Sequence, residues 1–217
     1  MKIPFPSRGL YAVTSDGLST PARGNRTNVD LIEAVERAIL GGATVIQYRE
    51  KTDDGYPRGQ QAAALLAACR GRGVPLIIND DVKLAAAIGA DGVHIGKDDT
   101  PLAEARARLG AELAIGVSCY NSIERAEQAQ REGADYVAFG SFYPSGTKPE
   151  AVPVTVSQLR EFRKRIRLPI VAIGGITPEN APPLIEAGAD LLAVISGVFG
   201  ETDIEAAARK YVGVFPP

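Results

Sequence analysis

The chain has 217 residues, enough to bury a full hydrophobic core. Its 24 basic and 26 acidic residues leave a net charge of −2, which gives no electrostatic reason to expect a nucleic acid or a membrane as partner. The two cysteines, Cys69 and Cys119, are too few and too far apart for a disulfide framework or a CxxC metal site. With an N-terminus that lacks the apolar run of a signal peptide, these features favour a cytoplasmic protein.

A pattern that recurs along the chain predicts its elements. Four times a helical segment closes in Gly-Ala and an apolar run follows, as in "GGATVIQY", "IGADGVHIG", "REGADYVAFG" and "EAGADLLAVISG". Glycine is favoured just past a helix C-terminus, so each copy indicates a helix leading into a strand. In chain order, the predicted strands are 9–15, 44–50, 74–80, 91–96, 112–118, 135–141, 169–175 and 190–197.

Helical patterns occupy the segments between these strands, with apolar residues at helical spacing or small, alanine-rich faces. The predicted helices are 28–41, 57–72, 81–89, 101–109, 122–133, 155–166, 177–188 and 203–213. Asn121 or Ser122, Thr155 and Thr177 are candidate caps, and Pro178 follows the last of them at a first-turn position.

Strict alternation of strands and helices predicts a parallel sheet. Eight such units in this length predict a closed (β/α)₈ barrel, the TIM barrel, as a single α/β domain over residues 1–217. A doubly wound sheet is the alternative, and a G-x-G-x-x-G turn after the first strand would favour it. The segment "YAVTSDGLSTPARG" contains no such turn.

Barrels carry their active sites at the C-terminal ends of the strands, and polar residues gather at these ends here. In "IQYREK", residues 46–51, the alternation of strand side chains places Gln47, Arg49 and Lys51 on one face. Polar groups also end the next strands, with Asn79 in "IIND" and Ser118 in "IGVS". We expect the opposite strand ends to show no such enrichment.

Glycines follow the last two predicted strands. Gly174 and Gly175 come after strand seven, and Ser196 and Gly197 come after strand eight. Backbone N–H groups that no side chain obstructs can hold a phosphate at this place in a barrel. The alternative is that these glycines only make tight turns.

Two aspartates, Asp80 and Asp99, end adjacent strands and could converge on one hard cation. Magnesium prefers a few carboxylates together with substrate phosphate oxygens and water. Aspartate is also a frequent helix cap, which is the competing interpretation. We assign Asp81 as a cap and Asp98 as a solvated neighbour, which leaves Asp80 and Asp99 as the magnesium pair.

Three cations, Arg49, Lys51 and Lys148, point towards the same rim of a slightly acidic protein. Crowded cations repel one another, so their arrangement indicates a polyanion between them, and a diphosphate with magnesium fits. His94, the single histidine, lies mid-strand. It is interpreted as a hydrogen-bonded supporting residue, because strand centres lie below the rim where barrel chemistry occurs.

Taken together, "QYREK", "IINDD", "DGVHIGKDD", "IGVS", "GTK", "AIGGI" and "VIS" resemble the thiamine-phosphate synthase (thiamine-phosphate pyrophosphorylase) family, from about residue 9 to residue 200. The resemblance implies a magnesium-dependent transferase of thiamine biosynthesis. It would join 4-amino-2-methyl-5-(diphosphooxymethyl)pyrimidine to 4-methyl-5-(2-phosphooxyethyl)thiazole, giving thiamine phosphate and diphosphate. Its partners would be these small molecules, with no nucleic acid or membrane, and the oligomeric state stays open.

The resemblance also implies roles for individual residues. Arg49, Lys51, Ser118 and Lys148 would be catalytic, and Asp80 and Asp99 would bind Mg²⁺. The residues expected to bind substrates are Gln47, Tyr48, Arg49, Glu50, Lys51, Asn79, Ser118, Ser145, Gly146, Thr147, Lys148, Gly175, Ile195 and Ser196. Lys97 departs from the family, which more often has glutamine there. In "PSGTK", Ser145 and Gly146 stand where threonine and a bulkier residue are common.

Two alternatives to a synthase remain. A thiazole tautomerase of the same superfamily would have a histidine just after strand five, where this chain has Cys119 and Tyr120. A non-catalytic sensor of phosphorylated thiamine precursors would keep the phosphate glycines and lose the charged residues, which are present here.

Overall fold

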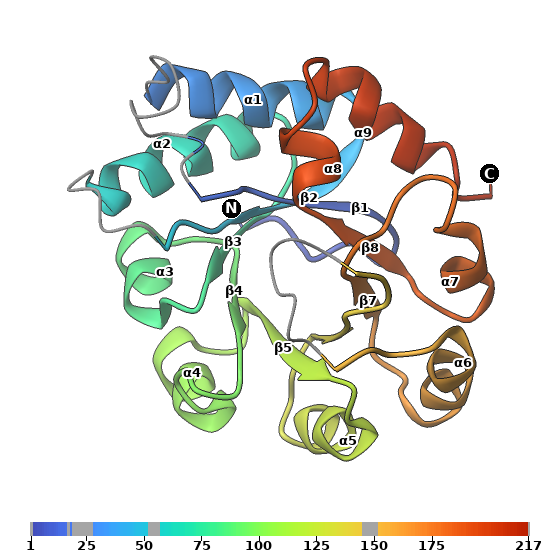
Figure 1. Cartoon of the computed structure of the whole chain (residues 1–217). Coiled ribbons are helices and arrows are strands. Elements are labelled where there is room, and N and C mark those ends of the chain that lie inside the picture. Colours follow the sequence, from blue (N-terminus) through green and yellow to red (C-terminus); the bar gives the residue numbers. More distant parts are fainter. Residues whose placement is uncertain (1, 17, 19–27, 52–56, 145–151, 217) are drawn as a thin grey trace.

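The computed structural model describes residues 2–16, 18, 28–51, 57–144 and 152–216. Its parallel strands close into a barrel in chain order, from β1 to β8, with helices around the outside (Figure 1). The predicted TIM barrel is therefore confirmed. The strands are β1 (Gly9–Val13), β2 (Ala43–Tyr48), β3 (Leu76–Asn79), β4 (Gly92–Ile95), β5 (Ala114–Tyr120), β6 (Tyr136–Phe139), β7 (Ile170–Ile173) and β8 (Leu191–Val194).

Each strand is followed by helical structure. The helices are α1 (Asn28–Leu40), α2 (Arg58–Gly71), α3 (Val82–Ile88), α4 (Leu102–Leu109), α5 (Ile123–Arg131), α6 (Val156–Arg165), α7 (Pro182–Glu186), α8 (Ser196–Phe199) and α9 (Ile204–Val212). Ser122 and Thr155 cap α5 and α6 as predicted, the latter in a capping box. The short helix α8 was not predicted, and it begins within the segment expected to end strand eight.

The seventh helix begins later than predicted. Thr177 and Asn180 bond each other's backbone N–H groups and form a turn, so Thr177 does not cap α7. The helix starts at Pro182 and Pro183. Proline has no N–H to donate and is tolerated only in the first helical turn, which explains where α7 begins.

Strand side chains alternate between two apolar layers. One cluster fills the barrel interior and includes Val45 and Ile77, whereas the larger cluster lies between strands and helices and includes Ile46 and Ile78. On β2, Gln47 continues the inward row begun by Val45. The predicted alternation of this strand is thus realised.

The N-terminal ends of the strands carry charges that the sequence reasoning overlooked. Three buried or partly buried ion pairs lie at this end of the barrel: Arg70–Asp91, Arg106–Asp135 and Arg163–Asp190. In each pair the aspartate directly follows a Gly-Ala sequence. Each aspartate also accepts a backbone N–H from the neighbouring strand, as Asp91 does from Leu76 at 3.0 Å. The expectation of no polar enrichment at this end was wrong, because a strand's first N–H groups also need acceptors.

Candidate active site

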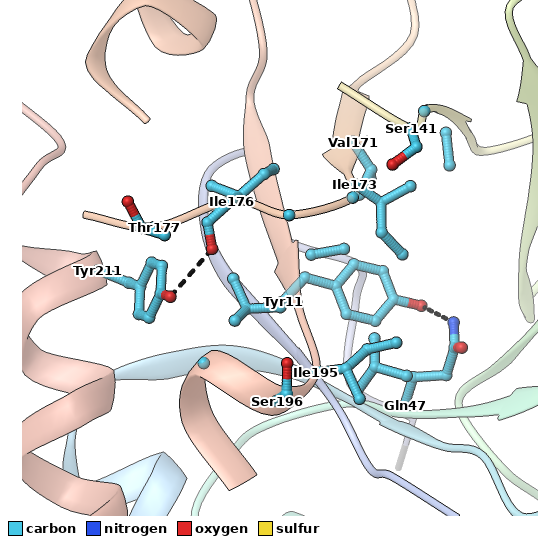
Figure 2. A pocket seen from close by; sticks show the side chains of 18 of the residues that line it. Tyr11, Gln47, Ser141, Val171, Ile173, Ile176, Thr177, Ile195, Ser196 and Tyr211 are labelled. Carbon is cyan, nitrogen blue, oxygen red and sulfur yellow. Dashed lines mark hydrogen bonds between the residues drawn. The ribbon is translucent and has the colours of Figure 1, made fainter. Parts of the chain in front are cut away.

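A cavity of about 640 Å³ opens at the C-terminal ends of the strands and extends over β7 and β8 to α8 and α9. Figure 2 shows side chains from several strands converging on it. Half of the predicted substrate-binding residues line this cavity: Gln47, Arg49, Asn79, Ser118, Gly175, Ile195 and Ser196. Ser145, Gly146, Thr147 and Lys148 lie outside the described residues.

The end of β2 presents polar groups to the cavity. Gln47 is buried and donates from Nε2 to the Tyr11 hydroxyl at 2.8 Å, as Figure 2 shows. Arg49 lies one strand repeat further on, at the cavity wall. Lys51 follows at the exposed rim, where its Nζ lies 2.9 Å from Asp80 Oδ2. The predicted polar face therefore runs from the cavity floor to its rim.

The segment after β1 holds this polar face in position. The Thr14 hydroxyl accepts the Arg49 N–H at 2.9 Å and donates to the Arg49 carbonyl at 3.0 Å. Asp16 bonds the Arg49 guanidinium at 2.6 Å and the Lys51 N–H at 2.8 Å. Sequence reasoning missed Asp16, although its place just after strand one, at the same rim, was an available signal. Its carboxylate orients one cation and balances part of the positive charge.

Tyr48 and Glu50 are placed differently from the sequence-based assignment. The Tyr48 hydroxyl donates to Gln61 on α2, and neither Tyr48 nor Glu50 lines the cavity. Both are buried. The reason is strand alternation, which turns these side chains away from the face that carries Gln47 and Arg49.

Asp80 and Asp99 lie close enough to hydrogen-bond each other. Although burial alone raises the pKa of Asp80, hydrogen bonds from Lys51 and Asp99 bring it below its usual value. Burial and the neighbouring Asp80 carboxyl raise the pKa of Asp99. The 2.6 Å hydrogen bond from the Gly96 N–H lowers it, but the net shift is upward. The two carboxyl groups therefore interact, and their pKa values move in opposite directions.

Such a pair fits a magnesium ion. Mg²⁺ commonly takes one or two carboxylates and completes its shell with water and substrate phosphates, and Asp80 and Asp99 offer two adjacent carboxylates. Within the described residues, no group of three or more His, Cys, Asp and Glu side chains could hold a metal without such help. Asp81 caps α3 through the Leu84 N–H at 2.8 Å, as predicted, and Asp98 is exposed.

The other end of the cavity is built from glycines and a helix start. Gly174 and Gly175 have φ of +107° and +59°, and they line the cavity together with Ser196, where α8 begins. A Cβ at Gly175 would lie 2.4 Å from the Pro144 carbonyl oxygen, so only glycine fits. Barrels often bind phosphate between the loops after strands seven and eight and a short extra helix, which is the arrangement found here.

His94 is a buried supporting residue, as the sequence predicted. Its Nδ1 lies 3.1 Å from the Tyr136 hydroxyl and its Nε2 lies 2.8 Å from Ser118 Oγ. These two contacts tie the ring, which comes from β4, to β6 and β5 at the cavity floor.

The closed barrel has Arg49 at one end of its cavity, with Lys51 and the paired carboxylates at the neighbouring strand ends, and a phosphate-type turn at the other end. This arrangement defines a TIM-barrel enzyme of phosphorylated small molecules. Residues 10–198 match the family model described as thiamine monophosphate synthase. The chain belongs to this family. It has thiamine-phosphate synthase activity and is a transferase of thiamine biosynthesis.

Curated relatives are similar over nearly their whole length. The thiamine-phosphate synthase of Nitrosococcus oceani is 52% identical, covering 96% of this chain and 93% of that protein. That of Methylococcus capsulatus is 49% identical, covering 99% of this chain and 92% of that protein. The resemblance expected from the motifs is therefore confirmed.

Solved structures agree with this result. The thiamine phosphate pyrophosphorylase of Pyrococcus furiosus superposes with a TM-score of 0.83 at 33% identity, covering 96% of this chain and 95% of that one. A 3-hexulose-6-phosphate synthase, with a TM-score of 0.70 at 16% identity and coverage of 95% and 100%, shares the fold alone. Among the described residues, no helix combines the length and apolar character that crossing a membrane requires.

Proposed function

We propose that the substrates are the aminopyrimidine diphosphate and the thiazole phosphate, joined with release of diphosphate. The observation that carries the proposal is a single cavity with an anion-binding feature at each end. Arg49 lines one end, with Lys51 at the exposed rim, and Gly175 and Ser196 line the other end. A volume of about 640 Å³ suits two small molecules held side by side.

The diphosphate would lie against the polar end. Arg49 and Lys51 supply positive charge, and Asn79 and Ser118 supply neutral hydrogen-bond donors at the cavity wall. Asp80 and Asp99 would hold Mg²⁺ beside Lys51. When bound, the ion would neutralise part of the negative charge on the diphosphate. The family resemblance adds Lys148 to this set.

Catalysis then follows from where charge develops. The carbon–oxygen bond to the diphosphate breaks, its electron pair leaves with the diphosphate, and a pyrimidine methyl cation remains. Arg49 and Lys51 stabilise the leaving group, and one such aligned donor is typically worth about 10²–10³ in rate. The neutral thiazole nitrogen, held in line by its phosphate, forms the new bond with its own lone pair. No side chain has to remove a proton first.

The other assigned residues would bind and orient. Gln47 would align the pyrimidine ring, and Gly175, Ile195 and Ser196 would hold the thiazole phosphate. The resemblance assigns Ser145, Gly146 and Thr147 to the same phosphate. We expect the protein to work in the cytoplasm, in keeping with its free, buried cysteines.

Neither alternative is favoured by the site. At the end of β5, near where a tautomerase would need histidine, the Cys119 side chain is buried outside the barrel interior. A sensor would not need the ordered contacts that Asp16 makes with Arg49 and Lys51.

Diphosphate release tests the proposal. The purified protein is given both precursors and magnesium, with controls that omit the thiazole phosphate or add a chelator. We expect diphosphate and thiamine phosphate to appear together only in the complete mixture. Tight binding of either precursor with no product would instead identify a sensor.

A further inference from the structure

A continuous row of hydrogen bonds crosses the cavity floor. It runs from Gln47 through Tyr11, Tyr136 and His94 to Ser118, and its members come from five strands. The heavy-atom distances along it are 2.8, 2.8, 3.1 and 2.8 Å. Tyr11 and Tyr136 are at most 1% exposed, and Gln47 and His94 are at most 9% exposed. We call these five residues the floor chain.

The floor chain has one direction. Gln47 Nε2 can only donate, so the Tyr11 oxygen accepts, and the single Tyr11 hydroxyl hydrogen goes to Tyr136. Tyr136 must then give its own hydrogen to His94 Nδ1. In neutral histidine the remaining hydrogen is on Nε2, and it points at the Ser118 oxygen.

Burial keeps this direction intact. It raises the pKa of both Tyr11 and Tyr136 well above the usual value for tyrosine, so both hydroxyls keep their hydrogens across the working pH range. Each tyrosine therefore has one hydrogen to give, and reversing one link requires every later link to reverse. An amide flip of Gln47 would have this consequence.

The two ends of the floor chain consequently offer defined groups to the cavity. At one end Gln47 keeps its Oε1, an acceptor, because its amide nitrogen is used by Tyr11. At the other end Ser118 keeps its hydroxyl hydrogen, a donor, because its oxygen is used by His94. A ligand that donates to Gln47 and accepts from Ser118 matches both ends.

We propose that Tyr11, Tyr136 and His94 act as positioning residues that fix the amide orientation of Gln47 and so select a substrate ring bearing an amino group. This selection rests on the proposed function. A ring with a carbonyl oxygen in place of the amino group would meet the Gln47 carbonyl oxygen and leave two acceptors facing each other. Sites that hydrogen-bond a donor reject analogues that lack it.

The Tyr136 ring stays in place without its hydroxyl. It stacks on Phe5 with centroids 4.0 Å apart and planes 4° apart. It also fills the space left by Gly116, where a Cβ would lie 1.9 Å from the ring. Tyr136→Phe therefore removes two hydrogen bonds of the floor chain, those to Tyr11 and to His94, and preserves the packing around the ring.

Nitrogen NMR of the histidine ring tests the direction without any substrate. The chain has one histidine, so in ¹⁵N-histidine-labelled protein the ring signals belong to His94. We expect a neutral ring with its hydrogen on Nε2 in the unchanged protein, and a mixture of tautomers in Tyr136→Phe. A hydrogen on Nδ1 in the unchanged protein would mean that the floor chain runs the other way and would overturn the proposal.

Kinetics test the selection. We compare kcat/KM for the aminopyrimidine diphosphate with that for the analogue carrying oxygen in place of the amino group. In Tyr136→Phe we expect the preference for the amino substrate to fall by roughly tenfold or more, because Gln47 is free to turn. Tyr143→Phe is the matched control, since it removes a tyrosine hydroxyl that bonds the Asn180 carbonyl outside the floor chain.

The outcomes separate the two proposals. An unchanged preference in Tyr136→Phe, or an equal loss in Tyr143→Phe, overturns the positioning role. If the unchanged protein turns over neither substrate, the proposed function fails, and the histidine NMR still decides the direction of the floor chain.

Discussion

Gly175→Ala probes the proposed phosphate end of the cavity. Gly175 has φ of +59°, a left-handed value that costs an L-residue about 1–2 kcal/mol. Its added Cβ would lie 2.4 Å from the Pro144 carbonyl oxygen, and such overpacking costs about 1–3 kcal/mol more. Gly89 has φ of +67° and nothing within 4 Å of an added Cβ, so alanine there has the backbone cost without the overpacking cost. Gly89→Ala is therefore the matched control.

Thermal unfolding measures the difference. At about 2.1 cal/mol/K per residue, 217 residues give an unfolding entropy of about 0.46 kcal/mol/K. Gly89→Ala should then lower Tm by about 2–4 °C and Gly175→Ala by about 4–11 °C. Because the second change also displaces the turn after β7, thiazole phosphate should bind more weakly to Gly175→Ala and normally to Gly89→Ala.

Equal losses of Tm in the two variants would refute this reasoning. They would show that the backbone angle alone accounts for the effect and that the Pro144 segment yields to the new methyl group. Unchanged thiazole phosphate affinity in Gly175→Ala would remove this glycine from the phosphate site.

Three further predictions concern other parts of the molecule. Lys51→Ala should lower kcat by about 10²–10³ with little change in thiazole phosphate Kd, and equal losses would contradict its assigned role. Burial raises the pKa of the Cys69 and Cys119 thiols to about 12, so neither should react with a disulfide reagent at pH 8 until the protein unfolds. The stability that this shift contributes is complete below the unfolded pKa of about 8.5 and lost as pH rises towards 12, which urea unfolding against pH would detect. Asp91→Ala should cost about 3–5 kcal/mol of unfolding free energy, because it removes the carboxylate that pairs with Arg70 and leaves the Leu76 N–H without its acceptor. A loss below about 1 kcal/mol would count against this structural role of Asp91.

Local chain chemistry made much of the fold predictable. Each Gly-Ala sequence marked a helix end, and the alternation in "IQYREK" indicated which side chains face inward. Ser122, Thr155 and Asp81 could be assigned as caps because capping is a contact between residues three apart. The late start of α7 was missed because Thr177 is a favourable capping residue, whereas the two prolines at positions 182 and 183 determine where the helix begins.

Contacts between distant segments were harder to predict. Asp16 reaches Arg49 across 33 positions, and Tyr11 reaches Tyr136 across 125. Neither pair shows a spacing signal, because barrel closure alone brings the segments together. The structural aspartates were overlooked for the same reason, since the strand N–H that each accepts belongs to the preceding repeat.

By itself, the sequence determined the barrel, the edge that carries the site and the family, since periodicity, turn residues and short motifs are local properties. Only the tertiary structure decided which polar groups share one cavity, that Tyr48 turns towards α2, and how the floor chain links Gln47 to Ser118. The physical reason is that a hydrogen bond depends on angstrom-scale distance and on direction. Those quantities exist only once all eight strands have closed around a common interior.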